Sequence, residues 1–299
     1  MNDVARCALT ACLWEVSARK AGNVHRFRDF DDLTYLDFVM SAAAMAPVLQ
    51  ADLDKPLGVT ILNAVRATRA MVRTNTNLGI VLLLAPLSKC EPPFSRSRLD
   101  AQLAATTVDD AKNVYEAIRL ANPGGLGKVD DQDIAGQPTQ TLREVMTLAA
   151  DRDLVATQYA DGFREVLDNG FPALLEGCSR FGSIEAAVLH LQIDLLSTFP
   201  DSLIARKHGL AEAEKVASRA REIDLSTAEG RRRFREFDRW LREDGHARNP
   251  GTTADLVAAC LFVALRSRQL NLASPFEWND LHSFVVDAER PNDSRFSPA

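Results

Sequence analysis

Residues 74–87 read Thr-Asn-Thr-Asn-Leu-Gly-Ile-Val-Leu-Leu-Leu-Ala-Pro-Leu. The first part of this stretch is polar, and the rest is apolar and carries no charge. The apolar run is too short to cross a membrane, which takes about 20 residues. We therefore predict a central buried helix here, with Thr74 or Asn75 capping its N-terminus and its polar end open to an active site.

Helical periodicity continues through most of the chain. Apolar residues recur at helical spacing over residues 3–19, 34–50, 56–71, 107–122, 141–182 with a break near Asp151–Asp153, 183–195, 210–223, 227–242 and 254–270. No alternating run beside a hairpin turn indicates a sheet. The sequence predicts an all-α fold in which residues 1–299 form a single compact domain, with a disordered tail at about 291–299.

Charge and cysteine content narrow the classes of function. The net charge of −6 argues against bulk electrostatic binding to nucleic acid or to an anionic membrane. The chain contains five cysteines, and they match no metal-site spacing and lie mostly in apolar segments. Buried reduced thiols are the expected state, and this predicts a cytoplasmic protein.

The polar loop at residues 23–32 is the first candidate site, and we expect it to be too polar for the core. Asp29, Asp31 and Asp32 offer oxygen ligands of the kind that Mg²⁺ prefers, while a turn with solvated acids explains the pattern equally well. His25 is a candidate acid, base or phosphate ligand, or simply a hydrogen-bonding group.

Three further segments could bind anions. Residues 204–209 form a polar connection in which Arg206 and Lys207 could grip phosphates, unless they sit at a solvated helix end. Residues 75–77 and 251–253 precede predicted helices, where free backbone N–H groups favour anions, although ordinary capping is the more common role. The arginine-rich segment 231–242 overlies an apolar stripe and indicates a solvated helix face.

The order of these motifs resembles the ATP:dephospho-CoA triphosphoribosyltransferase family, also called triphosphoribosyl-dephospho-CoA synthases. The resemblance spans most of the chain, from residue 10 to residue 270. It is carried by residues 15–25, the acidic run 29–32 leading to Ser41-Ala42, and residues 74–79, 200–209 and 249–256.

The resemblance implies an all-α enzyme that moves the triphosphoribosyl group of ATP to the ribose 2′-hydroxyl of 3′-dephospho-CoA and releases adenine. Such a transfer needs a base near the hydroxyl, stabilisation of the sugar cation and a clamp for the triphosphate. Catalytic roles are implied for Glu15, His25, Asp29 and Asp32, and a Mg²⁺ site for Asp29, Asp31 and Asp32. Roles in binding substrate or nucleotide are implied for Lys20, Asn23, Asn75, Thr76, Asn77, Gly79, Asp201, Ser202, Arg206, Lys207, Asn249, Gly251, Thr252 and Asp255.

Two motifs depart from the familiar family pattern and indicate a divergent branch. Residues 75–79 read Asn-Thr-Asn-Leu-Gly where familiar members read Asn-Thr-His-Lys-Gly, so a cation is absent where a phosphate could bind. Residues 20–25 read Lys-Ala-Gly-Asn-Val-His rather than Lys-Pro-Gly-Leu-Val-Asp.

These departures leave two alternatives. One is a nucleotide-dependent family member with another acceptor, such as a precursor of a tetrahydromethanopterin-type cofactor. The other is an inactive nucleotide-binding or scaffolding protein. The expected partners are ATP and a cofactor precursor. Binding to nucleic acid or to a membrane is not expected, and a homodimer is left open.

Overall fold

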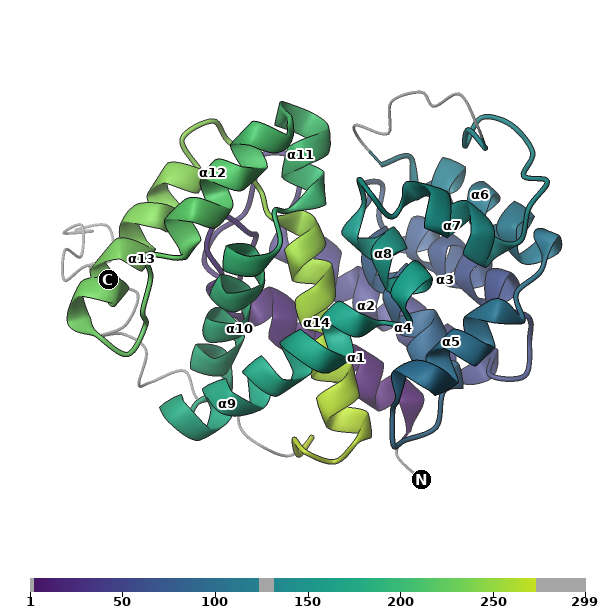
Figure 1. Ribbon diagram of the computed structural model, residues 1–299, viewed down its shortest axis with the longest axis horizontal. Coiled ribbons are helices and arrows are strands. Elements are labelled where there is room, and N and C mark those ends of the chain that lie inside the picture. The colour runs from purple at the N-terminus through teal and green to yellow at the C-terminus, as the bar shows by residue number, and fades with distance from the viewer. Residues whose placement is uncertain (1–2, 124–131, 273–299) are drawn as a thin grey trace, which may run out of the picture.

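The computed structural model describes residues 3–123 and 132–272, and every regular element in this part of the chain is a helix (Figure 1). In chain order they are α1 (Val4–Ser17), α2 (Tyr35–Ala51), α3 (Leu57–Met71), α4 (Leu78–Lys89), α5 (Arg96–Ala104), α6 (Val108–Ala121), α7 (Leu142–Ala149), α8 (Leu154–Asp161), the π-helix η1 (Glu165–Gly170), α9 (Phe171–Phe181), α10 (Ile184–Thr198), α11 (Ser202–His208), α12 (Leu210–Ala220), α13 (Ala228–Leu241) and α14 (Gly251–Arg266). The predicted all-α fold is confirmed. The predicted tail at 291–299 lies outside the described residues.

Helix α14 runs through the middle of the molecule, between two groups of helices (Figure 1). From Thr252 to Arg266 every residue except Asp255 is buried. Helix α4 packs against α14 and is buried from Ile80 to Ser88, because its apolar residues occupy all faces of the helix. The stretch around residues 80–87 is therefore a core helix, as predicted, and it shares the centre of the fold with α14.

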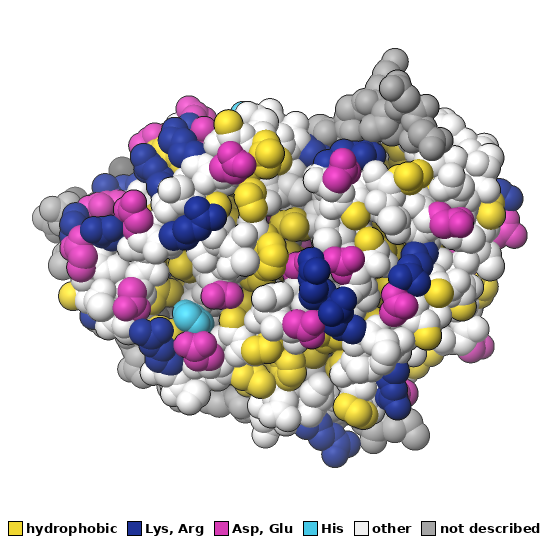
Figure 2. All heavy atoms as spheres, in the orientation of Figure 1, with side chains coloured by type: hydrophobic (Ala, Val, Ile, Leu, Met, Phe, Trp, Pro, Cys, Tyr) yellow, Lys and Arg dark blue, Asp and Glu magenta, His cyan; other side chains and the backbone are white. Residues whose placement is uncertain are grey.

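Apolar side chains form two clusters around this centre. The larger cluster surrounds α4 and α14, and the smaller one lies among α10, α11, α12 and α13. On the outer face of α13, Arg232 pairs with Glu229 and Glu236, while Phe234 and Phe237 point into the smaller cluster. Basic and acidic side chains are accordingly intermixed over α12 and α13 in Figure 2. No helix in the described ranges has both the length and the apolar character needed to cross a membrane.

The start of α4 matches the prediction in part, because the side chain of Asn75 caps the first turn although Asn75 lies two residues before the N-cap position. The helix begins at Leu78 with Asn77 as its N-cap residue, rather than with Thr74 or Asn75 in that position. The side chain of Asn77 is turned away, and its Nδ2 donates to Oγ1 of Thr68 at 3.1 Å. Asn75 supplies the missing acceptor, because its Oδ1 takes the backbone N–H of Leu78 at 3.2 Å.

Two segments that were predicted as loops are helical. Residues 202–208 form α11, because Asp201 caps its first turn and Ile204 is buried. Helix α14 begins at Gly251, three residues before the predicted start at residue 254. Arg206 and the 251–253 turn are consequently fixed on helices.

Candidate active site

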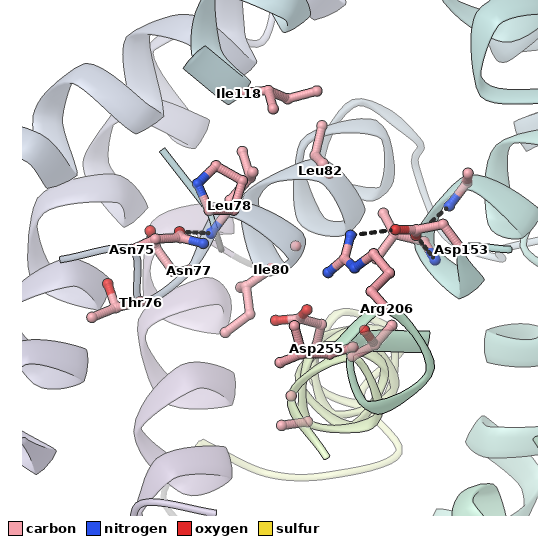
Figure 3. A pocket seen from close by; sticks show the side chains of 18 of the residues that line it. Asn75, Thr76, Asn77, Leu78, Ile80, Leu82, Ile118, Asp153, Arg206 and Asp255 are labelled. Atoms are coloured by element: carbon pink, nitrogen blue, oxygen red, sulfur yellow. Dashed lines mark hydrogen bonds and ion pairs between the residues drawn. The ribbon is translucent and has the colours of Figure 1, made fainter. Parts of the chain in front are cut away.

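A cavity of about 790 Å³ lies where α4, α8, α11 and α14 come together (Figure 3). Its volume is within the range of ~300–1,000 Å³ that is usual for ligand pockets. Most of the predicted site residues line it, although they come from distant parts of the sequence. They are Glu15, Asn23, Asp32, Asn75, Thr76, Asn77, Gly79, Arg206, Lys207, Asn249, Gly251, Thr252 and Asp255.

The other end of this cavity is apolar and was not predicted. We call it the apolar arm; it is formed by α4, α6, α7 and α8 and lined by Leu78, Leu82, Val114, Ile118, Leu142, Val145, Met146 and Val155. Figure 3 shows Leu78 and Leu82 on the side of α4 that faces Ile118, whereas Ile80 points to the opposite side of the helix, toward Asp255. The side chains of the apolar arm follow ordinary core spacing, so the sequence carries no signal that they border a cavity. The cavity can therefore hold a molecule with an apolar part and a polar, charged part.

A second cavity of similar volume, about 790 Å³, adjoins the first. The two share Asp32, Arg206, Lys207 and His246, which we call the shared wall. The second cavity is also lined by Arg28, Asp29, Phe30, Asp31, His208, Arg242, Asp244, Gly245 and Ala247. Cations on the shared wall can thus face an anionic group from either side.

Residues 19–26 are held against α10 by two buried side chains. Glu185 accepts from Nε of Arg19 at 2.9 Å and from Nη2 of Arg26 at 2.9 Å. Gln192 donates to the carbonyl oxygen of Ala21 at 2.8 Å and to Oδ1 of Asn23 at 3.0 Å. Because these bonds satisfy the polar groups, residues 21–25 are buried, and the prediction that this loop is too polar for the core is wrong for its first part.

Lys20 is fully buried and does not line either cavity. Its Nζ lies 2.7 Å from Oε1 of Glu15 and also donates to the backbone carbonyl of Glu15. Burial raises the pKa of Glu15, and the ammonium of Lys20 opposes that shift. The structure thus places Lys20 behind Glu15, and it is Glu15 that reaches the cavity.

His25 also lies outside the linings of both cavities. Burial, followed by the positive charges of Arg242, Lys20, Arg26 and Arg28, lowers its pKa to about 2, so the ring is neutral near pH 7. Its Nδ1 accepts the backbone N–H of Phe27 at 3.3 Å. This placement gives the ring a hydrogen-bonding role within the loop.

The three aspartates expected to bind Mg²⁺ do not converge. Within the described residues, no group of three His, Cys, Asp or Glu side chains is arranged to hold a metal ion. Asp29 is used locally, because its Oδ1 accepts the backbone N–H of Tyr35 at 2.6 Å. Asp32 faces His246, with 3.1 Å between Oδ1 and Nδ1. The predicted three-aspartate metal site is therefore not assembled in this structure.

Asp201 and Ser202 fix the helix ends behind the cavity without lining it. Oδ2 of Asp201 accepts the N–H and the hydroxyl of Thr253 at 2.7 and 2.8 Å, while its Oδ1 caps α11. Burial raises the pKa of Asp201, and the bonds from Thr253 oppose that shift. The hydroxyl of Ser202 donates to Oγ1 of Thr252 at 3.0 Å. These contacts lock α11 to α14.

Arg206 and Asp255 face the cavity from α11 and α14 (Figure 3). Nη1 of Arg206 lies 2.9 Å from Oδ2 of Asp153, while its Nε is buried without a hydrogen-bond partner. Asp153 also caps α8. In the sequence Asp153 stands out only as part of a helix break, and its place in the cavity could not be predicted because a capping aspartate has no distinguishing pattern.

The fold and the cavity define an all-α protein with a pocket suited to a small molecule that has both an apolar and an anionic part. The family model described as ATP:dephospho-CoA triphosphoribosyl transferase matches residues 1–274. The chain therefore belongs to this family, which places it among transferases that use ATP and act in cofactor biosynthesis.

Individual relatives agree with this assignment. Two proteins of Streptococcus equi subsp. zooepidemicus, strains MGCS10565 and H70, are each named as a probable 2-(5''-triphosphoribosyl)-3'-dephosphocoenzyme-A synthase. Each is 25% identical over 292 residues, which cover 90% of this chain and 98% of the relative. A crystal structure from Archaeoglobus fulgidus, described as a triphosphoribosyl-dephospho-CoA synthase, is 31% identical with a TM-score of 0.59, covering 76% of this chain and 97% of that chain. These matches do not favour an enzyme with another acceptor or an inactive protein.

Proposed function

We propose that this protein transfers the triphosphoribosyl group of ATP to the ribose 2′-hydroxyl of 3′-dephospho-CoA and releases adenine. The observation that carries the proposal is the first cavity, in which an apolar arm leads into a polar end beside two cations. A nucleoside triphosphate has the same division, with a flat base at one end and a polyanion at the other.

The apolar arm suits the adenine of ATP. Leu78 and Leu82 form one wall and Ile118 faces them, so a purine ring could be buried between aliphatic side chains (Figure 3). The ribose would then lie at the polar end, next to Glu15 and the first turn of α4. With adenine buried in the apolar arm, C1 of the ribose would lie between the apolar arm and the polar end of the cavity.

The triphosphate suits the shared wall. Arg206 projects from α11 with a guanidinium that has one partner, Asp153, and retains further N–H donors. Lys207 lies beside it and lines both cavities. Because the wall opens to both sides, the second cavity can receive the diphosphate of dephospho-CoA while the first holds ATP.

A magnesium ion would enter with ATP rather than occupy a cage of protein ligands. Mg²⁺ commonly keeps several waters and binds one or two carboxylates together with substrate phosphates. Asp31 and Asp32 line the second cavity together with Arg206 and Lys207. These two aspartates could supply the one or two carboxylates that a Mg²⁺ ion bound to substrate phosphates needs. The ion would neutralise part of the charge of the triphosphate.

Release of adenine tests the proposed function. The purified protein is incubated with ATP, Mg²⁺ and 3′-dephospho-CoA, and free adenine and the triphosphoribosylated product are measured by liquid chromatography with mass detection. We expect equal amounts of both, and none when dephospho-CoA is omitted. ADP or AMP in place of adenine would contradict the proposal, as would tight ATP binding without turnover.

The compartment and the assembly state are further proposals. Both substrates and the free cysteines are compatible with a cytoplasmic enzyme. A homodimer is supported by two large apolar side chains at the start of the chain, Phe27 and Leu36, which are 65% and 63% exposed. Sedimentation of the wild type and of a Phe27→Ser, Leu36→Ser variant would test the dimer.

A further inference from the structure

Among the described residues, one carboxyl group in the lining of the first cavity has no hydrogen-bond or ion-pair partner. Of the five carboxylates in its lining, Asp32 faces His246, Asp133 accepts from the backbone of Ala135, Asp153 pairs with Arg206 and Glu15 pairs with Lys20. Asp255 forms no hydrogen bond or ion pair with any described residue. Asp255 is partly exposed to the cavity, yet the surrounding protein desolvates its carboxyl group. A desolvated carboxyl group without a partner is costly to a fold, and such groups cluster at functional sites.

The backbone of α4 is shaped to admit this carboxyl group. Gly79 is the second residue of α4, and a Cβ atom at that position would lie 2.0 Å from Oδ2 of Asp255 and 2.5 Å from its Cγ. Any side chain at residue 79 would therefore displace the carboxyl group. Figure 3 shows Asp255 between Ile80 of α4 and Arg206 of α11, on the side of α4 to which Ile80 points.

Asp255 and Glu15 lie in contrasting electrostatic environments. Burial raises the pKa of Asp255 well above its ordinary value; the charges of Glu15, Asp201 and Asp153 raise it further, while Arg206 lowers it. Burial also raises the pKa of Glu15, but there the adjacent ammonium of Lys20 opposes the shift. Two coupled carboxyl groups whose surroundings push their pKa values apart are suited to opposite proton-transfer roles.

We propose that Asp255 is the general acid that protonates the departing adenine, and that Glu15 is the base that accepts the proton of the attacking hydroxyl. This assignment rests on the proposed function, because it uses adenine as the leaving group. Lys20 and Gly79 are positioning residues, which act through Glu15 and Asp255 respectively.

The proton and electron balance of the step is complete. The acceptor oxygen forms a bond to C1 of the ribose while the bond from C1 to adenine breaks, and the electron pair of the broken bond stays on adenine. The carboxyl proton of Asp255 neutralises the base, and the hydroxyl proton passes to Glu15. Transfer of one proton from Glu15 to Asp255 then restores the starting state.

The surroundings of Asp255 favour the protonated carboxyl group before the proton transfer and also stabilise the carboxylate that remains after it. Burial and the negative charges around it keep the proton in place before the reaction. The carboxylate that remains after proton transfer lies against the first turn of α4, where the helix dipole favours negative charge, and Arg206 also attracts it. The group is thus held neutral until a stronger base forms beside it.

Asp255→Asn is the first test, measured as adenine release at saturating ATP and dephospho-CoA. Loss of a general acid lowers kcat about 100- to 10,000-fold. We also expect the alkaline limb of the kcat–pH profile to disappear in this variant, while the KM for ATP changes little. Asp224→Asn, which alters an exposed carboxylate remote from both cavities, is the matched control and should keep the wild-type profile.

A substrate with a different leaving group distinguishes the role of Asp255 as the acid from the role of Glu15 as the base. A ribosyl triphosphate that carries a pyridinium base, such as nicotinamide, releases a neutral base without a proton. Asp255→Asn should approach the wild-type rate with this substrate, whereas Glu15→Gln should stay impaired. An equal defect of Asp255→Asn with both substrates, or an intact alkaline limb, overturns the assignment.

Gly79→Ala provides a second route if Asp255→Asn folds poorly. The added Cβ should displace the carboxyl group and lower kcat in the wild-type background, but have little further effect in Asp255→Asn, because both changes remove the same contribution. Full additivity contradicts the inference. If the wild type releases no adenine, the proposed function fails together with this inference; if it does and Asp255→Asn is fully active, only the inference fails.

Discussion

Replacing Lys20 by methionine should destabilise the protein strongly. Lys20 and Glu15 form a buried ion pair, with side-chain exposures of 0% and 4% and 2.7 Å between Nζ and Oε1. Removing one partner of such a pair leaves an uncompensated buried charge and costs about 3–5 kcal/mol in the free energy of unfolding. In a chain of this size, that loss corresponds to a fall of roughly 6–20 °C in Tm.

The loss of stability should depend on pH in a defined direction. Burial already raises the pKa of Glu15, and without Lys20 the pKa rises further. A carboxyl group whose pKa is higher in the folded state than in the unfolded state stabilises the fold at low pH, and that stability is lost as the pH rises through the folded-state value. The deficit of Lys20→Met relative to the wild type should therefore be larger at pH 8 than at pH 5.

Urea unfolding followed by circular dichroism at pH 5 and pH 8 measures this deficit. Lys112→Met is the matched control, because Lys112 pairs with Asp109 at the surface, where such a pair contributes about 0–1 kcal/mol. A second variant, Lys20→Met with Glu15→Leu, should regain most of the lost stability. The reasoning is refuted if Lys20→Met loses less than about 1 kcal/mol at pH 8, or if its deficit is larger at pH 5.

Three further predictions concern the cavity and the loop behind it. Arg206→Leu should raise the KM for ATP about 10-fold or more, as expected for a lost charge-assisted bond; Arg96→Leu, which removes an exposed arginine, should leave it unchanged. The His25 ring should show no titration by NMR between pH 5 and pH 8, because its pKa is lowered to about 2. Since that value is below the unfolded one, His25 should also make stability fall as the pH drops below about 6.5. Met146→Trp should fill the apolar arm and weaken inhibition by added adenine, with little change in the KM for dephospho-CoA; unchanged adenine inhibition would place the base elsewhere.

The core helix and the polar helix ends could be predicted from the sequence because their signals are local. An uncharged apolar run near residues 80–87 has few alternatives to burial in a helical protein. Polar motifs at helix ends have free backbone groups, and this property marks them before their partners are known. Such signals marked residues 75–77 and 251–253 as candidate anion sites, and the family resemblance implied binding roles within residues 75–79 and 249–255. Residues of both segments line the first cavity.

The features that could not be predicted, namely the burial of Lys20 and the apolar arm, depend on contacts between segments that are distant in the sequence. Lys20 belongs to a polar segment and looks like a residue that would meet solvent or phosphate. It is buried because Glu185 and Gln192, more than 160 positions away, hold the neighbouring backbone against α10. The apolar arm has the same cause: residues such as Met146 look like core, and they border a cavity only because of how α4, α6, α7 and α8 are spaced.

The changed motif at residues 77 and 78 takes on a different meaning in the structure. Asn77 is hydrogen-bonded to Thr68, and Leu78 is 8% exposed and lines the apolar arm. Compared with the motif of familiar family members, this turn of α4 therefore lacks a cation and adds an apolar side chain to the cavity lining. Arg206 and Lys207 place two cations on the shared wall, so capacity for a polyanion is retained in the cavity.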